Sequence, residues 1–133
     1  MSSPHPELCV GAIVVHGDRL LLVRRGRGAG TGLWSIPGGR VELGETMEQA
    51  VRRELSEETG LEAREVSYVA HVERLGEGWH FVIHDHLVTI DDAAGAVAGD
   101  DAAEVAWIPL DRLDSTDGLV PGLVDFLDEH GLR

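Results

Sequence analysis

The 133-residue chain contains no lysine and no asparagine, and all eleven of its basic residues are arginines. Against them stand 24 aspartates and glutamates, which give a formal net charge of −13 at pH 7. A surface that binds nucleic acid needs clustered basic side chains and a high isoelectric point. The composition therefore argues against a nucleic-acid partner. A phosphate-rich ligand would have to be held locally, by a few arginines or by metal ions.

Cysteine and long hydrophobic runs are scarce as well. The single Cys9 stands among Leu8, Val10 and Ala12, a context typical of a small buried side chain, so a disulfide within the chain is excluded. No run approaches the roughly 20 apolar residues of a membrane-spanning helix, and the polar start lacks signal-peptide character. The chain is 43% hydrophobic and 26% charged. We expect one globular domain over residues 1–133, without a membrane partner and located in the cytoplasm.

Acidic residues are concentrated in the segment 39–61, GRVELGETMEQAVRRELSEETGL. A helix over 46–59 would place four charged side chains on one arc of roughly 140°, beside its apolar stripe. These residues are Arg53, Glu54, Glu57 and Glu58. Partly desolvated carboxylates raise one another's pKa unless a cation keeps them ionised. Since Mg²⁺ and Mn²⁺ select carboxylate oxygens, the segment predicts a divalent-metal site.

Local signals support this helix. Thr46 can serve at the N-cap, Glu45 and Glu48 suit the positive end of the helix dipole, and Gly60 supplies a left-handed end. The alternative interpretation is a solvated, glutamate-rich face on which Arg53 pairs with Glu57 across one turn.

The spacing within this segment resembles the signature box of the Nudix hydrolases. Gly39, Glu45, the run Arg53-Glu54-Leu55, the pair Glu57-Glu58 and Gly60-Leu61 match all nine fixed positions. Residues 20–25, 32–39 and 104–110 resemble the family's segments before and after the box. The resemblance therefore covers nearly the whole chain.

The remaining pattern predicts an α+β fold. The expected elements are a hairpin of 8–15 and 19–24, a short strand over 34–37, long strands over 66–75 and 79–90, a mobile acidic loop over 91–103, a strand over 104–108 and an amphipathic helix over 121–130. Without regular βαβ alternation, this order indicates a sandwich with the sheet between helices. The resemblance implies the same architecture, a Nudix-type α/β/α sandwich with a mixed β-sheet.

The resemblance also implies roles for the acidic residues. It makes Glu57, Glu58 and the carbonyl of Gly38 metal ligands and Glu54 either a further ligand or the base, while Arg53 orients the box carboxylates. The general base is a box glutamate or an acid from a distant loop, for which Glu104 is the candidate and Asp100 and Asp101 are competitors. Glu104 would then serve catalysis or the metal. Its alternative is a solvated loop acid.

Candidates for substrate binding lie elsewhere in the chain. For phosphates the sequence offers Arg25, followed by Arg24, Arg27 and Arg40. For a base or sugar it offers the aromatic residues Trp34, Tyr68, Trp79 and Phe81, each of which is equally suited to a core position. His80, His84 and His86 would share one strand face. They suggest a zinc site or a substrate contact, with a plain polar face as the alternative.

As a function, the resemblance implies a pyrophosphohydrolase that depends on Mg²⁺ or Mn²⁺. It would split a nucleoside diphosphate linked to another moiety, such as ADP-ribose, into a nucleoside monophosphate and a phosphorylated product. Residues 80–85 and 99–107 resemble small bacterial ADP-ribose pyrophosphatases. The alternatives are a MutT-like nucleoside triphosphate pyrophosphohydrolase and a non-catalytic nucleotide sensor. The partner is a small nucleotide, and a homodimer is common in the family.

Overall fold

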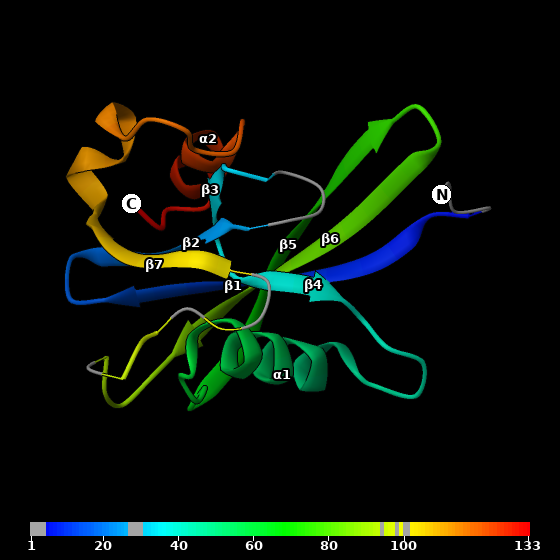
Figure 1. The fold of residues 1–133 in the computed structure, drawn as a ribbon, viewed down its shortest axis with the longest axis horizontal. Coiled ribbons are helices and arrows are strands. Elements are labelled where there is room, and N and C mark those ends of the chain that lie inside the picture. The colour runs from blue at the N-terminus through cyan, green and yellow to red at the C-terminus, as the bar shows by residue number, and fades with distance from the viewer. Residues whose placement is uncertain (1–4, 27–30, 94, 98, 100–101) are drawn as a thin grey trace.

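The computed structural model describes residues 5–26, 31–93, 95–97, 99 and 102–133. Within these residues the chain forms β1 Glu7–His16, β2 Arg19–Arg25, β3 Trp34–Ser35, β4 Gly38–Arg40, α1 Met47–Thr59, β5 Glu65–Gly76, β6 Trp79–Thr89, β7 Ala102–Pro109, the 3₁₀ helix η1 Leu110–Ser115, and α2 Leu123–Glu129. Figure 1 shows α1 on one side of the strands and α2 on the other. The predicted α+β sandwich is confirmed.

The described strands form one mixed sheet with β1 near its centre. The first strand runs parallel to β6, and β6 pairs with β5 in a long antiparallel hairpin. On its other edge β1 pairs antiparallel with β4 near its start and with β2 at its end. β2 also carries the antiparallel strands β3 and β7. This arrangement brings the glycine-rich β4 next to the centre of the sheet.

The two faces of the sheet bury separate apolar clusters. On one face Val10, Ala12 and Val14 of β1 pack against Val51 and Leu55 of α1. On the other face a second cluster packs against η1 and α2, with Ile13, Leu20, Leu22, Leu113, Phe126 and Leu127 as members. Alternate residues of β1 thus point to opposite helices, as the two-residue period of a strand requires.

The helix predicted over 46–59 is confirmed together with its ends. Thr46 is the N-cap, and its side chain and that of Gln49 form a reciprocal capping box. Gly60 ends the helix in the left-handed conformation, with φ 75°, and its N–H donates to the carbonyl of Ser56. These signals are local in sequence, which fixes where α1 begins and ends.

The C-terminal helix is shorter than predicted. α2 begins at Leu123 rather than residue 121, because Gly122 adopts a left-handed conformation with φ 87° just before it. Pro121 therefore precedes the helix. The strand predicted over 104–108 extends over Ala102–Pro109, and η1 and β4 were not predicted. The predicted loop over 91–103 is only partly described, and Asp100, Asp101 and Arg27 lie outside the described residues.

The remaining sequence expectations on the fold concern Cys9 and membrane spans. Cys9 is buried, as predicted. Among the described residues, no helix combines the length and the apolar character needed to cross a membrane.

Candidate active site

Arg53 of α1 is the centre of an ion-pair network at the acidic face of this helix. Its Nε and Nη2 donate to the two carboxylate oxygens of Glu45 at 2.7 and 2.9 Å. Its Nη1 donates to Glu54 at 2.7 Å and to Glu57 at 3.2 Å. Nη2 also reaches the carbonyl of Arg40 at 3.0 Å. One guanidinium therefore holds box glutamates and the strand that precedes the box in a fixed relation.

This network affects the acids unequally. Hydrogen bonds from Arg53 lower the pKa of Glu45 and stabilise its carboxylate. For Glu54, desolvation by burial is the larger effect and raises its pKa, although Arg53 opposes it. Neighbouring charge from Glu57 adds to the rise. An added cation would therefore favour the charged form of Glu54.

Glu54 also explains why position 39 is a glycine. A Cβ on Gly39 would lie 2.6 Å from the carboxyl carbon of Glu54 and equally close to its Oε1. The carboxyl group of Glu54 therefore occupies the space that any larger residue on β4 would fill. At Gly38, a Cβ would lie 2.2 Å from the carbonyl oxygen of Val10 on β1. Only glycines allow this approach of β4 to both α1 and β1.

Glu58 lies at the inner end of the arc and is almost completely buried, with 4% of its surface exposed. Its Oε2 accepts a hydrogen bond from the N–H of Gly38 at 3.2 Å, and its Oε1 lies 3.6 Å from Nη1 of Arg25. Arg25 also donates to the carbonyl of Gly38 at 3.1 Å. The end of β2, the start of β4 and the helix therefore meet at one point.

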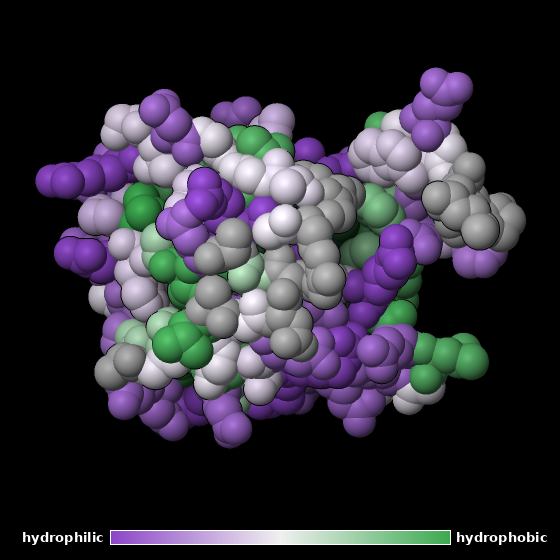
Figure 2. Space-filling view, in the orientation of Figure 1, coloured by the Kyte–Doolittle hydropathy of each residue, from purple (hydrophilic) through white to green (hydrophobic). Residues whose placement is uncertain are grey.

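A cavity of about 880 Å³ opens beside this meeting point. Arg25, Gly38, Glu54 and Glu58 line one end of it. The rest of its wall comes from the α2 face of the sheet and from the segment that leads into α2. Its volume lies within the range typical of small-molecule sites, roughly 300–1,000 Å³. Figure 2 shows hydrophilic side chains gathered over α1.

The aromatic candidates separate into two groups. Phe81 and Trp79 line the cavity, and their rings lie 5.2 Å apart. Arg40, which also lines the cavity, lies 6.0 Å from the Phe81 ring and pairs with Glu7. Trp34 instead packs against the core cluster on the α2 side. Phe81 and Arg40 thus line a cavity in which their predicted contact with the substrate can form, whereas Trp34 packs against the core.

Glu104 is held on a neighbouring strand pair. It lies opposite Arg24 on β7 and β2, and the two side chains form an ion pair. Arg24 also lies 5.8 Å from the ring of Trp34. The structure therefore gives Glu104 a partner in Arg24. Its role as base or metal ligand remains a prediction.

The histidines of β6 have other neighbours. His80 lies 3.1 Å from Glu73, while His84 and His86 contact the ring of Tyr68 on β5. In the part of the chain that the structure describes, no three His, Cys, Asp or Glu side chains are gathered closely enough to hold a metal as they stand. The zinc hypothesis therefore gains no support here.

The donor set nevertheless fits a hard divalent cation. Glu54, Glu57 and Glu58 offer only oxygen ligands from a single helix, and the backbone of Gly38 and Gly39 lies beside them without side chains. Arg53 and Arg25 now neutralise these acids.

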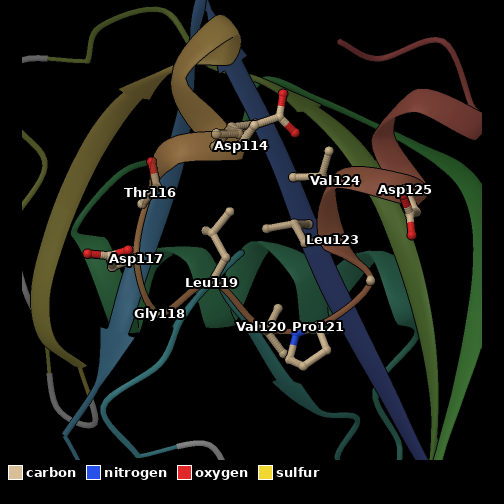
Figure 3. Close-up of a pocket in the computed structure, with 12 residues that line it drawn as sticks. Asp114, Thr116, Asp117, Gly118, Leu119, Val120, Pro121, Leu123, Val124 and Asp125 are labelled. Atoms are coloured by element: carbon tan, nitrogen blue, oxygen red, sulfur yellow. The ribbon is translucent and has the colours of Figure 1, made fainter.

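A smaller hollow of about 370 Å³ lies between η1 and the start of α2. Figure 3 shows that its acids, Asp114, Asp117 and Asp125, point in different directions. Asp114 is also paired with Arg133 at 2.8 Å. The two hollows share only residues 120–123, the segment before α2 and the first residue of this helix. This hollow has no converging chemical groups, and it is not a candidate active site.

One buried acid in the large cavity was not singled out from the sequence. Asp85 on β6 lines the cavity and is 5% exposed. Burial raises its pKa to about 7, and the charge of Arg74 partly opposes that rise. The signal in the sequence was an aspartate at an inward position of a long strand, between Ile83 and Leu87.

Comparisons with known proteins agree with this geometry. The family model for the NUDIX domain matches residues 5–129. An oxidized purine nucleoside triphosphate hydrolase from Danio rerio is 35% identical over 107 residues, which cover 80% of this chain and 69% of that protein. An ADP-ribose pyrophosphatase from Methanocaldococcus jannaschii is 34% identical over 110 residues, covering 82% and 65%.

A solved structure supports the fold. The MutT NUDIX hydrolase from Burkholderia pseudomallei superimposes with a TM-score of 0.84 at 27% identity, covering 95% of this chain and 98% of that one. The family match covers almost the whole chain and includes α1, β4 and the residues that line the large cavity. The chain therefore belongs to the Nudix hydrolase family.

Proposed function

We propose that this hydrolase splits the phosphoanhydride of a nucleoside diphosphate linked to another moiety, with ADP-ribose as the model substrate. The products are a nucleoside monophosphate and a phosphorylated remainder. The observation that carries the proposal is the position of Glu54 and Glu58 at one end of the large cavity, next to Gly38. An anhydride at that end leaves room in the cavity for the group on one side of it, while the other group extends outward. The ADP-ribose pyrophosphatase relative supports the same choice.

The proposed cofactor is Mg²⁺, with Mn²⁺ as a substitute, held by Glu57 and Glu58 with the carbonyl of Gly38. When bound, such an ion neutralises phosphate charge and lowers the pKa of water. Arg25 is placed to bind a phosphate oxygen, because it lies in the cavity wall beside Glu58. Arg53 keeps the carboxylates in orientation through its contacts with Glu45, Glu54 and Glu57.

A proton acceptor is needed when water attacks phosphorus. Glu54 borders the cavity, whereas Glu104 is paired with Arg24 on the β2–β7 strand pair. We therefore assign this role to Glu54. Phe81 and Arg40, which line the same cavity, are placed to contact the sugar or base.

A second candidate is a nucleoside triphosphate pyrophosphohydrolase, which releases a nucleoside monophosphate and pyrophosphate. The observation that favours it is the 35% identity to the oxidized purine nucleoside triphosphate hydrolase. The two candidates use the same carboxylates and differ in the group beyond the anhydride.

A substrate panel with product identification by mass spectrometry tests the proposal. We expect ADP-ribose to give AMP and ribose 5-phosphate, with AMP itself left intact as the phosphomonoester control. EDTA should abolish turnover, and Mg²⁺ or Mn²⁺ should restore it. Faster turnover of nucleoside triphosphates would favour the second candidate. Inertness toward every diphosphate, or turnover that persists in chelator, would overturn the proposal.

A further inference from the structure

Asp85 is a buried acid at the deep part of the cavity, on the sheet floor. It pairs with Gly11 of β1 in the β1–β6 register, and Gly11 pairs with Gly38 of β4. Its Oδ1 and the end of Ile36 lie 2.2 and 2.8 Å from where a Cβ on Gly11 would be. Gly11 therefore leaves the room in which the carboxyl group of Asp85 lies.

The strand register sets the distance between Asp85 and Gly38, which lies at the end of the cavity proposed for the anhydride. Neighbouring strands lie about 4.8 Å apart, so two strand steps from Gly38 to Asp85 cover about 10 Å. This separation is comparable to that between the phosphate and the base of one nucleotide. Along the floor, Ile83 lies next to Asp85, and Leu123 and Phe126 of α2 line the same cavity. A flat ring can enter between these apolar side chains.

The carboxyl group of Asp85 is incompletely satisfied. Its Oδ1 is buried, and no described residue forms a hydrogen bond with it. An unsatisfied buried polar atom costs about 1–3 kcal/mol of folding free energy, and such atoms are rare in native structures. A rotation of the side chain that turns Oδ1 toward the cavity lets a ligand form this hydrogen bond and recover the cost on binding. Because Asp85 lines the cavity, that ligand is one that enters the cavity.

The electrostatic state of Asp85 defines which ligand fits. Burial favours the neutral acid, and the charge of Arg74 on β5 only partly opposes this effect. A neutral carboxyl group presents one donor and one acceptor side by side. This pair matches an amide or amidine edge, in which a ring nitrogen or carbonyl stands beside an N–H group. A phosphate offers no such edge, and its charge would meet an acid.

We propose that Asp85 recognises the nucleobase of the substrate, by one donated and one accepted hydrogen bond to an amide or amidine edge. The inference rests on the proposed function, and it adds that the nucleoside half of the substrate enters the cavity under α2. The group beyond the anhydride then points toward the outer part of the site. Asp85 is thus a specificity-determining residue on the floor of the cavity.

Two substitutions separate this role from a structural one. Asp85→Asn keeps a donor and an acceptor without charge, whereas Asp85→Leu removes both. The control is His86→Leu, which changes a buried polar neighbour that packs against Tyr68 rather than lining the cavity. Thermal unfolding of each variant establishes that it is folded.

Binding of nucleoside 5′-monophosphates and of ribose 5-phosphate, measured by calorimetry with Mg²⁺ present, tests the proposal directly. In Asp85→Leu we expect nucleotide affinity to fall by tenfold to a hundredfold, and affinity for ribose 5-phosphate to stay within twofold. Asp85→Asn and His86→Leu should keep nucleotide affinity within threefold. Full nucleotide affinity in Asp85→Leu, or an equal loss for both ligands, would overturn the assignment. Turnover is measured separately, so a failure of the proposed hydrolysis is distinguished from a failure of base recognition.

Discussion

Arg53 donates two parallel hydrogen bonds to Glu45. They join Nε and Nη2 of the guanidinium to the two oxygens of the carboxylate, over distances of 2.7 and 2.9 Å. This bidentate geometry fixes the plane of the guanidinium. The Nη1 that remains is thereby aimed at Glu54 and Glu57. Glu45 therefore acts on the acidic arc through Arg53, although it contacts neither Glu54 nor Glu57 in these bonds.

A change of Arg53 to lysine should reduce kcat by about tenfold to a hundredfold, the range for groups that orient metal ligands. Lysine keeps the charge but cannot form the planar fork that joins Glu45 to Glu54. Arg52→Lys is the matched control, because Arg52 pairs with Glu48 and with carbonyls after the helix. Steady-state kinetics at saturating Mg²⁺ measure both. Equal activity of the two variants would contradict the orienting role.

The change Glu57→Gln should lower kcat by at least a hundredfold to a thousandfold, the effect of losing one preorganised electrostatic group. Half of the Glu57 side chain is exposed, so the variant should unfold at nearly the wild-type temperature. The control is Glu48→Gln, which changes another exposed acid of α1 and should keep full activity. Wild-type turnover by Glu57→Gln would remove this residue from the catalytic site.

A methyl group on residue 39 should affect activity more than stability. The Cβ of Gly39→Ala would meet the carboxyl group of Glu54 at 2.6 Å, and that group is the mobile end of a side chain. The helix can remain in place while the carboxylate moves, and a displacement of about 1 Å can reduce the rate by a hundredfold. We expect kcat to fall at least tenfold.

The control for this change is Gly95→Ala, where an added Cβ meets nothing within 4 Å and φ is not positive. Thermal unfolding and kinetics of both variants are compared. A loss of folding in Gly39→Ala without a separate loss of kcat would show that the glycine serves packing alone.

The parts of the fold that were predicted correctly have local causes. The capping box at Thr46 and the left-handed Gly60 lie within a few residues of the helix that they end. The acidic arc follows from helical periodicity alone. In contrast, the pairing of Glu104 with Arg24 depends on β2 meeting β7, eighty residues further along the chain. Such long-range contacts have no signature in the spacing of nearby residues.

Prediction from the sequence is limited in the same way for Asp85, although this residue lies within a strand that was predicted. The alternation along β6 indicates that residues 83, 85 and 87 share a face. It does not show that Gly11 on β1 leaves room for a carboxyl group, nor that a cavity opens above it. Those facts arise only when β1, β6 and α2 have assembled. The sequence therefore indicated the acidic arc of α1 but not the floor of the cavity beside it.

Asp85 should make the protein less stable as the pH rises. The thiol of Cys9 on β1 lines the same cavity, and its own burial raises its pKa. Burial also raises the pKa of Asp85, from 3.8 to about 7, and the charge of Arg74 on β5 opposes this rise. Between about pH 4 and 7 the Asp85 side chain therefore binds more protons in the folded protein than in the unfolded chain. Its ionisation lowers the free energy of unfolding through this window, by an amount that approaches about 4 kcal/mol above pH 7. Asp85→Asn removes the titration, so its stability should exceed that of the wild type increasingly from pH 5 to pH 8.

Urea unfolding of wild type and Asp85→Asn at pH 5 and pH 8 measures this effect. Other groups titrate equally in both proteins, so the difference between their pH dependences isolates Asp85. Asp128→Asn is the control, because Asp128 is an exposed acid whose pKa is lowered by its hydrogen bond with Arg133, the opposite direction. Identical pH dependence in wild type and Asp85→Asn would mean that the carboxyl group of Asp85 is already ionised in the folded protein, and that its place in the cavity wall is compatible with a charge.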